Sequence, residues 1–471
     1  MPKRFEYGER MSETDALLWN NERDPMLRST ILSLMLLDRA PDEARFLAAI
    51  DRALARIPRL RQRVVLDPLE AAPPRWALDP RFNSAYHVRR VGAPGKGSLR
   101  ELLDFAAPIG MQAFDKDRPL WEFYLVDGLE QGRQALLMKL HHSITDGVGL
   151  VRMTSSLVER SREGEPGRAS PPRSVDEEAE LVPERGPFEE ALAAVRYRAG
   201  SDFARASRLS RALREGAGEL VRHPQGALRR ASELAGSIAR SLRPVSEPLS
   251  PLMTGRSLAI RLDAISRPLV ELKRAGKSVG GTLNDAFVAA VAGGLRLYHE
   301  RHRRPVRELR MTMPINLRDA TDGGHAGNEF APARFAVPIG IADPAERMRA
   351  IRSRVAVERA EPALPITAEI AGLLGRLPRA LAVPLFGSML KAIDFVTSNV
   401  PGPPYPVYVS GARVEQMWGF GPLSGAAANV TAFSYDGELA FGVNTDPAAV
   451  PDPELFVECL ERGVAEVLAV G

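Results

Sequence analysis

The sequence predicts an α/β protein made of two similar halves, each a mixed sheet flanked by helices, with a cleft between them. Apolar runs of strand length alternate with apolar residues at helical spacing before residue 160, and again after residue 251. No short-period repeat is visible, but the two regions have a similar content of elements. We therefore expect a first domain at 1–160, a linker at 161–250 and a second domain at 251–471. Ligands usually bind between such halves.

Composition limits the class of protein. The chain has 471 residues, 45% hydrophobic and 26% charged, as in ordinary globular proteins. No apolar run approaches the ~18 residues of a membrane span, and the N-terminus has no secretory signal. We expect a cytoplasmic protein, soluble or peripherally attached to a membrane. The single Cys459 lies in an apolar helical pattern and is expected to be a buried small side chain.

Charge gives a weaker indication of partners. The formal net charge is +4 and the pI is about 9.3, which favours anionic partners such as acidic lipid headgroups. No basic stripe with interleaved aromatic residues is present, so nucleic acid is not an expected partner.

The spacing of apolar residues and the positions of prolines and turns predict the elements of the first domain. Pro41 and Asp42 open a helix and Pro58 stops it, while a turn at 128–132 joins two strands into an antiparallel pair. The expected strands are at 31–38, 61–68, 118–129 and 134–142, and the expected helices at 42–57 and 99–107.

The linker has two parts. Residues 161–185 are polar and rich in Pro, Glu, Arg and Ser, as in an exposed connection. Residues 187–242 are helical and basic, and Gly216, Gly218 and Pro224 predict interruptions that leave two or three helices. This stretch can be a basic amphipathic segment lying on a membrane, or a crossover whose apolar side packs on the protein. The two interpretations are compatible if part of the apolar stripe is exposed.

The second domain repeats the alternation of strands and helices. We expect its second strand to end at Pro314. The expected strands are at 256–263, 308–314, 334–341, 393–403 and 437–446, and the expected helices at 269–275, 282–300, 345–359, 368–381 and 453–468.

One stretch carries the candidate chemistry. Residues 136–150, LLMKLHHSITDGVGL, read as a buried strand, a tight polar loop and the start of a helix. Because side chains alternate along a strand, His141 and His142 point to opposite faces, so one can face a cleft while the other packs behind it. Asp146 follows across the loop, and Gly147 permits a sharp turn. From these residues alone, His142 can be a catalytic base or a structural histidine.

Further motifs narrow the interpretation. His141, His142, Asp146 and Gly147 form HHxxxDG, which is similar to the active-site signature of the CoA-dependent acyltransferase superfamily. In order along the chain follow PLW at 119–121, ND at 284–285, MPINLR at 313–318, GN at 327–328, SNVPGP at 398–403 and YDGELAFGVNTD at 435–446. With this set the chain resembles the bacterial wax ester synthase/diacylglycerol acyltransferase family over nearly its whole length.

The resemblance implies a fold and a reaction. The fold would be two chloramphenicol acetyltransferase-like domains with an active-site tunnel between them. The reaction would move a long acyl chain from acyl-CoA, a co-substrate rather than a cofactor, to diacylglycerol, a long-chain alcohol or both. The partners would include a membrane or lipid-droplet surface. Two alternatives stay open: an enzyme of the same fold that acylates a small soluble hydroxyl or amine, and a non-catalytic lipid-binding protein.

The resemblance also assigns roles to the histidine loop. His142 would be the general base for direct attack by the alcohol, with no acyl-enzyme. His141 would be structural or orient the acyl group. Asp146 would be an anchor, ion-paired with Arg318 across the domain interface. Gly147 would meet a backbone requirement beside the substrate. No metal is expected, because adjacent histidines lack helical ligand spacing and no Cys/His cluster accompanies them.

Four more positions have two interpretations each. Asn284 can form an N-cap pair with Asp285, or reach the active site and donate to the oxyanion or the substrate. Ser398 and Asn399 can be the polar end of a strand, or line the tunnel. Trp121 can be a core residue or a substrate contact.

Overall fold

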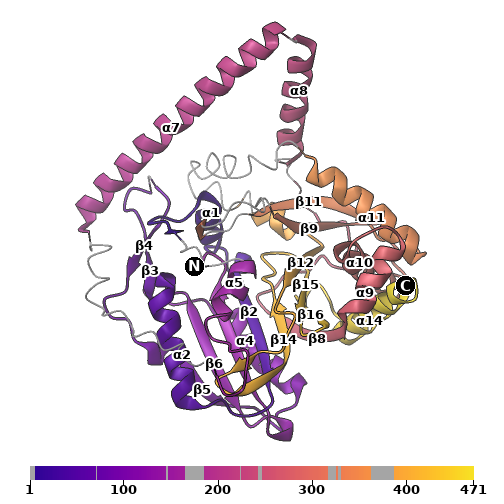
Figure 1. The fold of residues 1–471 in the computed structure, drawn as a ribbon. Helices are drawn as coiled ribbons and strands as arrows, with labels where there is room; N and C mark the ends of the chain where they lie inside the picture. Colours follow the sequence, from indigo (N-terminus) through magenta and orange to yellow (C-terminus); the bar gives the residue numbers. More distant parts are fainter. Residues whose placement is uncertain are drawn as a thin grey trace.

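The computed structural model describes residues 6–70, 72–144, 147–164, 185–222, 224–241, 245, 247–316, 325–326, 330–361, 384 and 387–471. Within these ranges the chain forms two six-stranded mixed sheets and two small two-stranded sheets, β1 (Glu6–Tyr7) with β10 (His325–Ala326) and β3 (Gln62–Val65) with β4 (Arg75–Leu78). The two large sheets lie side by side with helices on their outer faces (Figure 1). The predicted α/β class with two mixed-sheet halves is confirmed.

The first sheet has the order β13-β14-β2-β7-β6-β5 and is antiparallel except where β5 meets β6. Its members are β2 (Thr30–Leu37), β5 (Val88–Gly92), β6 (Trp121–Asp127), β7 (Gln134–His141), β13 (Tyr408–Val409) and β14 (Ala412–Phe420). One face packs on α2 (Glu43–Arg56) and the other on α4 (Leu99–Met111). Both faces are buried, which explains why β2 and β7 read as nearly continuous apolar runs.

Two strands of this sheet come from the far end of the chain. β14 pairs antiparallel with β2, from Val414 opposite Leu37 to Phe420 opposite Leu32, and β13 follows it at the edge. β14 also contacts β15 and β16 of the second sheet. Residues 408–420 therefore complete the first sheet although they belong to the second half of the sequence, an exchange that the sequence did not predict.

The second sheet has the order β11-β9-β12-β15-β16-β8, in which β12 runs parallel to both neighbours. Its members are β8 (Arg261–Pro268), β9 (Glu308–Asn316), β11 (Phe330–Pro338), β12 (Phe395–Pro401), β15 (Ala428–Tyr435) and β16 (Glu438–Thr445). The packed helices are α9 (Leu269–Ser278), α10 (Leu283–Arg301), α11 (Pro344–Arg359) and α14 (Pro453–Leu468). Central α10 is buried almost all round, and Cys459 on α14 is buried as expected.

The linker forms two helices, α7 (Pro187–Arg222) and α8 (Pro224–Ser241), which project from the sheets (Figure 1). The expected interruptions at Gly216 and Gly218 were wrong, since α7 runs through both. A glycine costs a helix only about 1 kcal/mol relative to alanine, whereas proline cannot continue one. Among the described residues, no helix has the length and apolar character that crossing a bilayer requires.

Several strand boundaries differ from expectation; β11 begins at Phe330 rather than at 334, and β6 at Trp121 rather than at 118. β8 begins at Arg261 rather than at 256, and β9 continues past Pro314 to Asn316. Proline is tolerated there because β12 pairs with β9 only at Met311 and Thr312, so no ladder partner on that side needs a donor from Pro314. The helix expected at 368–381 lies outside the described residues.

Several shorter helices complete the described fold. The helix α4 was expected to end at Ala107, but it continues through Pro108 to Met111. The other short helices are α1 (Glu13–Asn21), η1 (Pro25–Leu27), η2 (Pro58–Arg61), α3 (Ser84–His87), η3 (Glu130–Gly132) and α5 (Gly147–Thr154).

Candidate active site

The HHxxxDG stretch forms a strand, a turn and a helix, as predicted. β7 ends at His141, which pairs with Thr30 at the start of β2. The N–H of Ile144 donates to the carbonyl of His141 over 3.0 Å and closes the turn, and α5 begins at Gly147. Thr145 and Asp146 lie outside the described residues. The two histidines are therefore presented at one end of the first sheet.

His141 is sealed inside the protein, with 0% of its surface exposed. The N–H of Ser143 donates to its Nδ1 over 3.1 Å, so the neutral ring carries its proton on Nε2. That Nε2 lies 3.0 Å from Oε1 of Glu22. The rings of Trp19 and Phe114 pack edge-on against the imidazole, at centroid distances of 5.7 and 6.1 Å. The imidazole of His141 is thus contacted at both of its nitrogens and by two aromatic rings.

Glu22 ends α1, and its side chain is 5% exposed. Burial by itself raises the pKa of this carboxyl group. Contact with His141, the N–H of Ser29 and the charge of Lys116 together outweigh burial, so the pKa of Glu22 lies below its ordinary value. Glu22 is consequently an ionised, buried carboxylate directly behind the histidine pair.

His142 has a different environment. It is partly exposed, and its N–H donates to the carbonyl of Ser29 over 2.8 Å. Ser29 immediately precedes β2, so the backbone of His142 is fixed to the neighbouring strand. Of the two histidines, His142 is the one with surface that a substrate can approach.

The turn faces the second half of the chain. Helix α5 contacts β12, the strand that contains Ser398 and Asn399. Both side chains are partly exposed, and their residues pair with Thr431 and Ala432 of β15. The interpretation of these two residues as the polar end of a strand was wrong, because β12 continues to Pro401. Contact with substrate stays a prediction for both.

Asn284 is directed toward the second sheet rather than used as a cap. The N-cap of α10 is Thr282, which forms a reciprocal capping box with Asp285. The interpretation of Asn284 as part of the cap was therefore wrong. Its Nδ2 lies 3.6 Å from Sδ of Met313 on β9, within the MPINLR motif. Its role in the reaction stays a prediction.

Trp121 lies in the core. It is 0% exposed, its indole N–H donates to the carbonyl of Leu60 over 2.7 Å, and its ring stacks on His87 at 4.5 Å. The structure thus describes the core role, while the substrate contact stays a prediction. Arg318 lies outside the described residues, and so the ion pair between Asp146 and Arg318 also stays a prediction.

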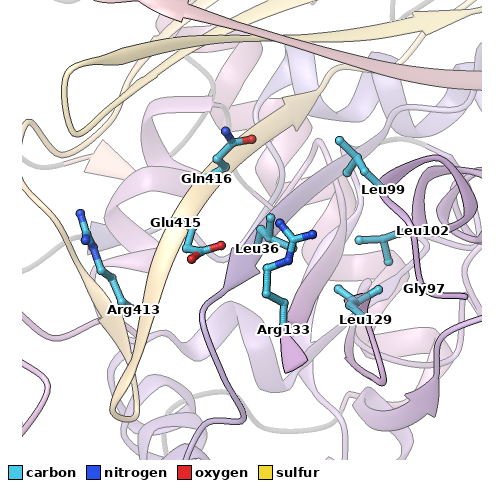
Figure 2. Close-up of a pocket in the computed structure, with 9 residues that line it drawn as sticks. All are labelled: Leu36, Gly97, Leu99, Leu102, Leu129, Arg133, Arg413, Glu415 and Gln416. Carbon is cyan, nitrogen blue, oxygen red and sulfur yellow. The ribbon is translucent and has the colours of Figure 1, made fainter. Parts of the chain in front are cut away.

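Two cavities lie at opposite ends of the first sheet. The larger, about 420 Å³, is lined by apolar side chains that include Leu36 and Leu102 and by charged Arg133 and Glu415 (Figure 2). Leu36 is six residues along β2 from Thr30, the partner of His141, which corresponds to roughly 20 Å. This cavity is therefore remote from the histidines.

The smaller cavity, about 60 Å³, lies at the histidine end. Thr30 lines it together with Arg256 and Asn444 from the second half of the sequence. The two halves of the chain thus meet beside the strand end that carries the histidines.

Sequence reasoning missed Glu22 and Ser29. They lie more than 100 positions before His141, at a helix end and before a strand, and neither belongs to a motif. A lone acidic residue at a helix end carries no sequence signal for such a contact.

Two mixed sheets flanked by helices, with β14 from the second half of the chain completing the first sheet and a paired-histidine turn at one end of it, define a two-domain α/β protein. Residues 11–287 match the wax ester synthase/diacylglycerol acyltransferase catalytic domain, and residues 326–467 match the C-terminal domain of the same family. The chain belongs to this family of acyltransferases.

Individual relatives agree with this assignment. One Mycobacterium tuberculosis protein, named as a candidate diacylglycerol O-acyltransferase, is 38% identical over 467 residues, covering 98% of this chain and 92% of the relative. A second protein of the same organism and similar name is 31% identical over 410 residues, covering 84% and 82%.

Solved structures show the same fold. A wax ester synthase/diacylglycerol acyltransferase from Marinobacter aquaeolei VT8 superposes with a TM-score of 0.63 at 22% identity, covering 97% of this chain and 98% of that one. The first condensation domain of the calcium-dependent antibiotic synthetase gives 0.62 at 17% identity, covering 98% and 95%. These likenesses concern the fold alone.

Proposed function

We propose that the protein transfers a long fatty acyl chain from CoA to diacylglycerol, to a long-chain alcohol, or to both. The observation that carries the proposal is the environment of His142 in a chain of this family. An accessible imidazole follows a sealed one, at the strand end where the two halves meet.

His142 would act as the general base. It accepts the proton of the acceptor hydroxyl as that oxygen attacks the thioester carbonyl. The tetrahedral oxyanion then collapses, the carbon–sulfur bond breaks, and the CoA thiolate recovers the proton from His142. The ester and free CoA are the only products, with no acyl-enzyme. Asn284 would donate to the oxyanion or position the substrate, and Asp146 with Arg318 would anchor the loop.

The test measures thiol release from palmitoyl-CoA by purified protein with a panel of acceptors. Replacing His142 with alanine should lower kcat by about 10²–10⁴-fold, the contribution of a general base. The matched control is His302→Gln, a partly exposed histidine at the C-terminal end of α10 that pairs with Asp452, which should keep its activity.

The acceptor panel distinguishes the alternatives. Turnover with small hydroxyls or amines only would favour the small-acceptor enzyme. No acceptor-dependent release with any acceptor would favour a lipid-binding protein. Full activity of His142→Ala would refute the assignment of the base.

We also propose that α7 binds a lipid surface, where such acceptors reside. The four most exposed large apolar side chains among those described on α7 are Phe188, Leu192, Val195 and Phe203, whereas Tyr197 packs against Arg10. At 100° per residue they fall within an arc of roughly 80°. The opposite side holds the helix to the protein through buried Glu190, which pairs with Arg75 at 2.9 Å and Arg10 at 3.3 Å.

The outward apolar stripe supports a lipid partner. A stripe that faces away from the protein gains nothing from the core, whereas a membrane interface would bury it. Exposed Arg196 and Arg211 on the same helix suit anionic headgroups.

The test is flotation with vesicles of phosphatidylcholine and phosphatidylglycerol. The variant Phe188→Ser/Phe203→Ser should bind at least about tenfold more weakly, since each buried phenylalanine contributes about 1.5–3 kcal/mol. The control replaces two exposed valines on other helices, Val270→Ser/Val357→Ser, and should bind normally. Equal binding of both variants would refute the role of α7.

A further inference from the structure

We infer that Glu22 is the positioning residue that holds His142 at the end of β7, through the ring of His141 on one side and the peptide of Ser29 on the other. The inference rests on the proposed role of His142 as the base. It concerns a residue outside the HHxxxDG loop, more than 100 positions earlier in the chain.

One carboxylate oxygen makes both contacts. Oε1 of Glu22 accepts the N–H of Ser29 over 2.8 Å and lies 3.0 Å from Nε2 of His141. The carbonyl of Ser29 in turn accepts the N–H of His142 over 2.8 Å. Glu22 therefore acts on the residue before His142 in sequence and on the residue that holds the backbone of His142 across the strand pair.

The surrounding contacts leave the imidazole of His141 few alternatives. Trp19 and Phe114 bracket the ring, and Nδ1 is occupied by the N–H of Ser143. Nε2 is the ring nitrogen on the side of Glu22, 3.0 Å from its Oε1. Lys116, whose ammonium lies 4.6 Å from the centre of the Trp19 ring, adds a positive charge near the carboxylate.

A second buried carboxylate, that of Glu122, pairs with a different residue on the same face of β7. Glu122 lies on the neighbouring strand β6, where its Oε2 is 3.8 Å from Nζ of buried Lys139 and also accepts the hydroxyl of Tyr124. Lys139 is two residues before His141 on the same face of β7. The cation on this face thus pairs with Glu122, while Glu22 contacts the histidine.

Removing the side chain of Glu22 should displace His142, the proposed base. The N–H of Ser29 would lose its acceptor in a buried site, the ring of His141 would lose the neighbouring carboxylate, and the strand end would shift to recover a partner. A displacement of about 1 Å at a catalytic group can cost roughly 100-fold in rate.

The experiment compares Glu22→Ala with Glu22→Gln. The alanine variant should lower kcat by about 100-fold and leave KM for palmitoyl-CoA within about threefold, because substrate contacts are unchanged. The glutamine variant keeps an acceptor oxygen at the same place and should recover kcat to within about tenfold of wild type. Each kcat is calculated per folded molecule after circular dichroism and thermal unfolding.

The matched control is Glu122→Ala, a buried carboxylate on β6 of the same sheet, whose partners are Lys139, Tyr124 and Arg89 rather than His141. It should lower Tm and leave kcat per folded molecule unchanged. If Glu22→Ala behaves in the same way, with a lower Tm and a normal kcat, the positioning role is overturned. If the alanine variant does not fold, Glu22→Asp replaces it: its carboxylate cannot reach both partners, so wild-type kcat would overturn the inference.

A double variant separates this inference from the proposed function. In the His142→Ala background, adding Glu22→Ala should not lower the residual rate further, because its effect passes through His142. Multiplicative losses would overturn the positioning role and leave the base assignment standing. Full activity of His142→Ala alone would overturn both.

Discussion

The two neighbouring histidines occupy different environments because β7 ends at His141, and His142 belongs to the turn that follows. His141 is directed into a pocket made by α1 and the segment after α4, where Glu22, Trp19 and Phe114 contact it. His142 then falls where the strand has ended and the turn begins. The adjacency of the two rings therefore gives one anchored residue and one accessible residue in consecutive positions.

Acid should expose the electrostatic part of the Glu22 contact. In the folded protein the pKa of Glu22 lies below its ordinary 4.5. The unfolded chain consequently binds more protons as the pH falls below about 4.5, and the contribution of Glu22 to stability, present above that pH, is lost as the pH falls through the lowered value.

The measurement is urea unfolding between about pH 3 and 6, the range that spans this loss. Wild type should lose stability more steeply toward acid than Glu22→Gln, and the exposed control Glu43→Gln should follow wild type. Parallel curves for wild type and Glu22→Gln would contradict the assignment of the lowered pKa to Glu22.

At the scale of elements, two residues at the start of α10 have different roles: Thr282 caps the helix, and Asn284 is proposed to act in the reaction. Thr282→Ala removes the acceptor of the capping box and should lower the free energy of unfolding by about 1 kcal/mol, with little change in kcat. Asn284→Ala should change stability by less than about 0.5 kcal/mol but lower kcat by about 10²–10³-fold if the amide stabilises the oxyanion. Urea unfolding and steady-state kinetics on both variants measure this. Unchanged kcat in Asn284→Ala would remove it from the site.

The elements that the sequence predicted are those with local causes. Helix α2 begins after the side chain of Asp42 caps it, and β2 and β7 are apolar runs because both faces of their sheet are buried. The boundary of β9 was missed because tolerance of Pro314 depends on where β12 stops pairing, which is a tertiary fact. The helix α7 passes two glycines because their cost is small beside that of proline.

For the site too, features with local causes were predictable and long-range contacts were not. The strand, turn and helix around His142 were predictable from spacing, whereas the contact of Glu22 with His141 joins residues far apart in sequence. Likewise, no local pattern reveals that β14 pairs with β2, since its apolar residues suit any sheet. Long-range pairing partners were therefore beyond prediction from one sequence.

At the scale of the whole molecule, the exchange of β14 couples the two halves. Gly442 of β16 lies under β14 so closely that an added Cβ would come 2.0 Å from the carbonyl oxygen of Gly419. Gly442→Ala should therefore push the sheets apart and lower the free energy of unfolding by several kcal/mol, about the upper range for overpacking. The control Gly92→Ala meets no atom within 4 Å and should be nearly neutral.

The measurement compares circular dichroism with tryptophan fluorescence during urea unfolding. Both signals should shift together in Gly442→Ala, because all four tryptophans, Trp19, Trp76, Trp121 and Trp418, pack in or against the first sheet while secondary structure reports on both sheets. Two separated transitions would show that the halves unfold independently and would contradict the coupling.

The pairing of β14 with β2 also has a consequence while the chain is being synthesised. When the ribosome has made the first 250 residues, one edge of β2 still lacks its neighbour, because residues 412–420 have not yet been translated. An open, apolar strand edge is a template for pairing with other chains. A nascent chain of this protein therefore carries an unprotected edge until translation is nearly finished, and during that interval chaperone binding is what would keep it from aggregating.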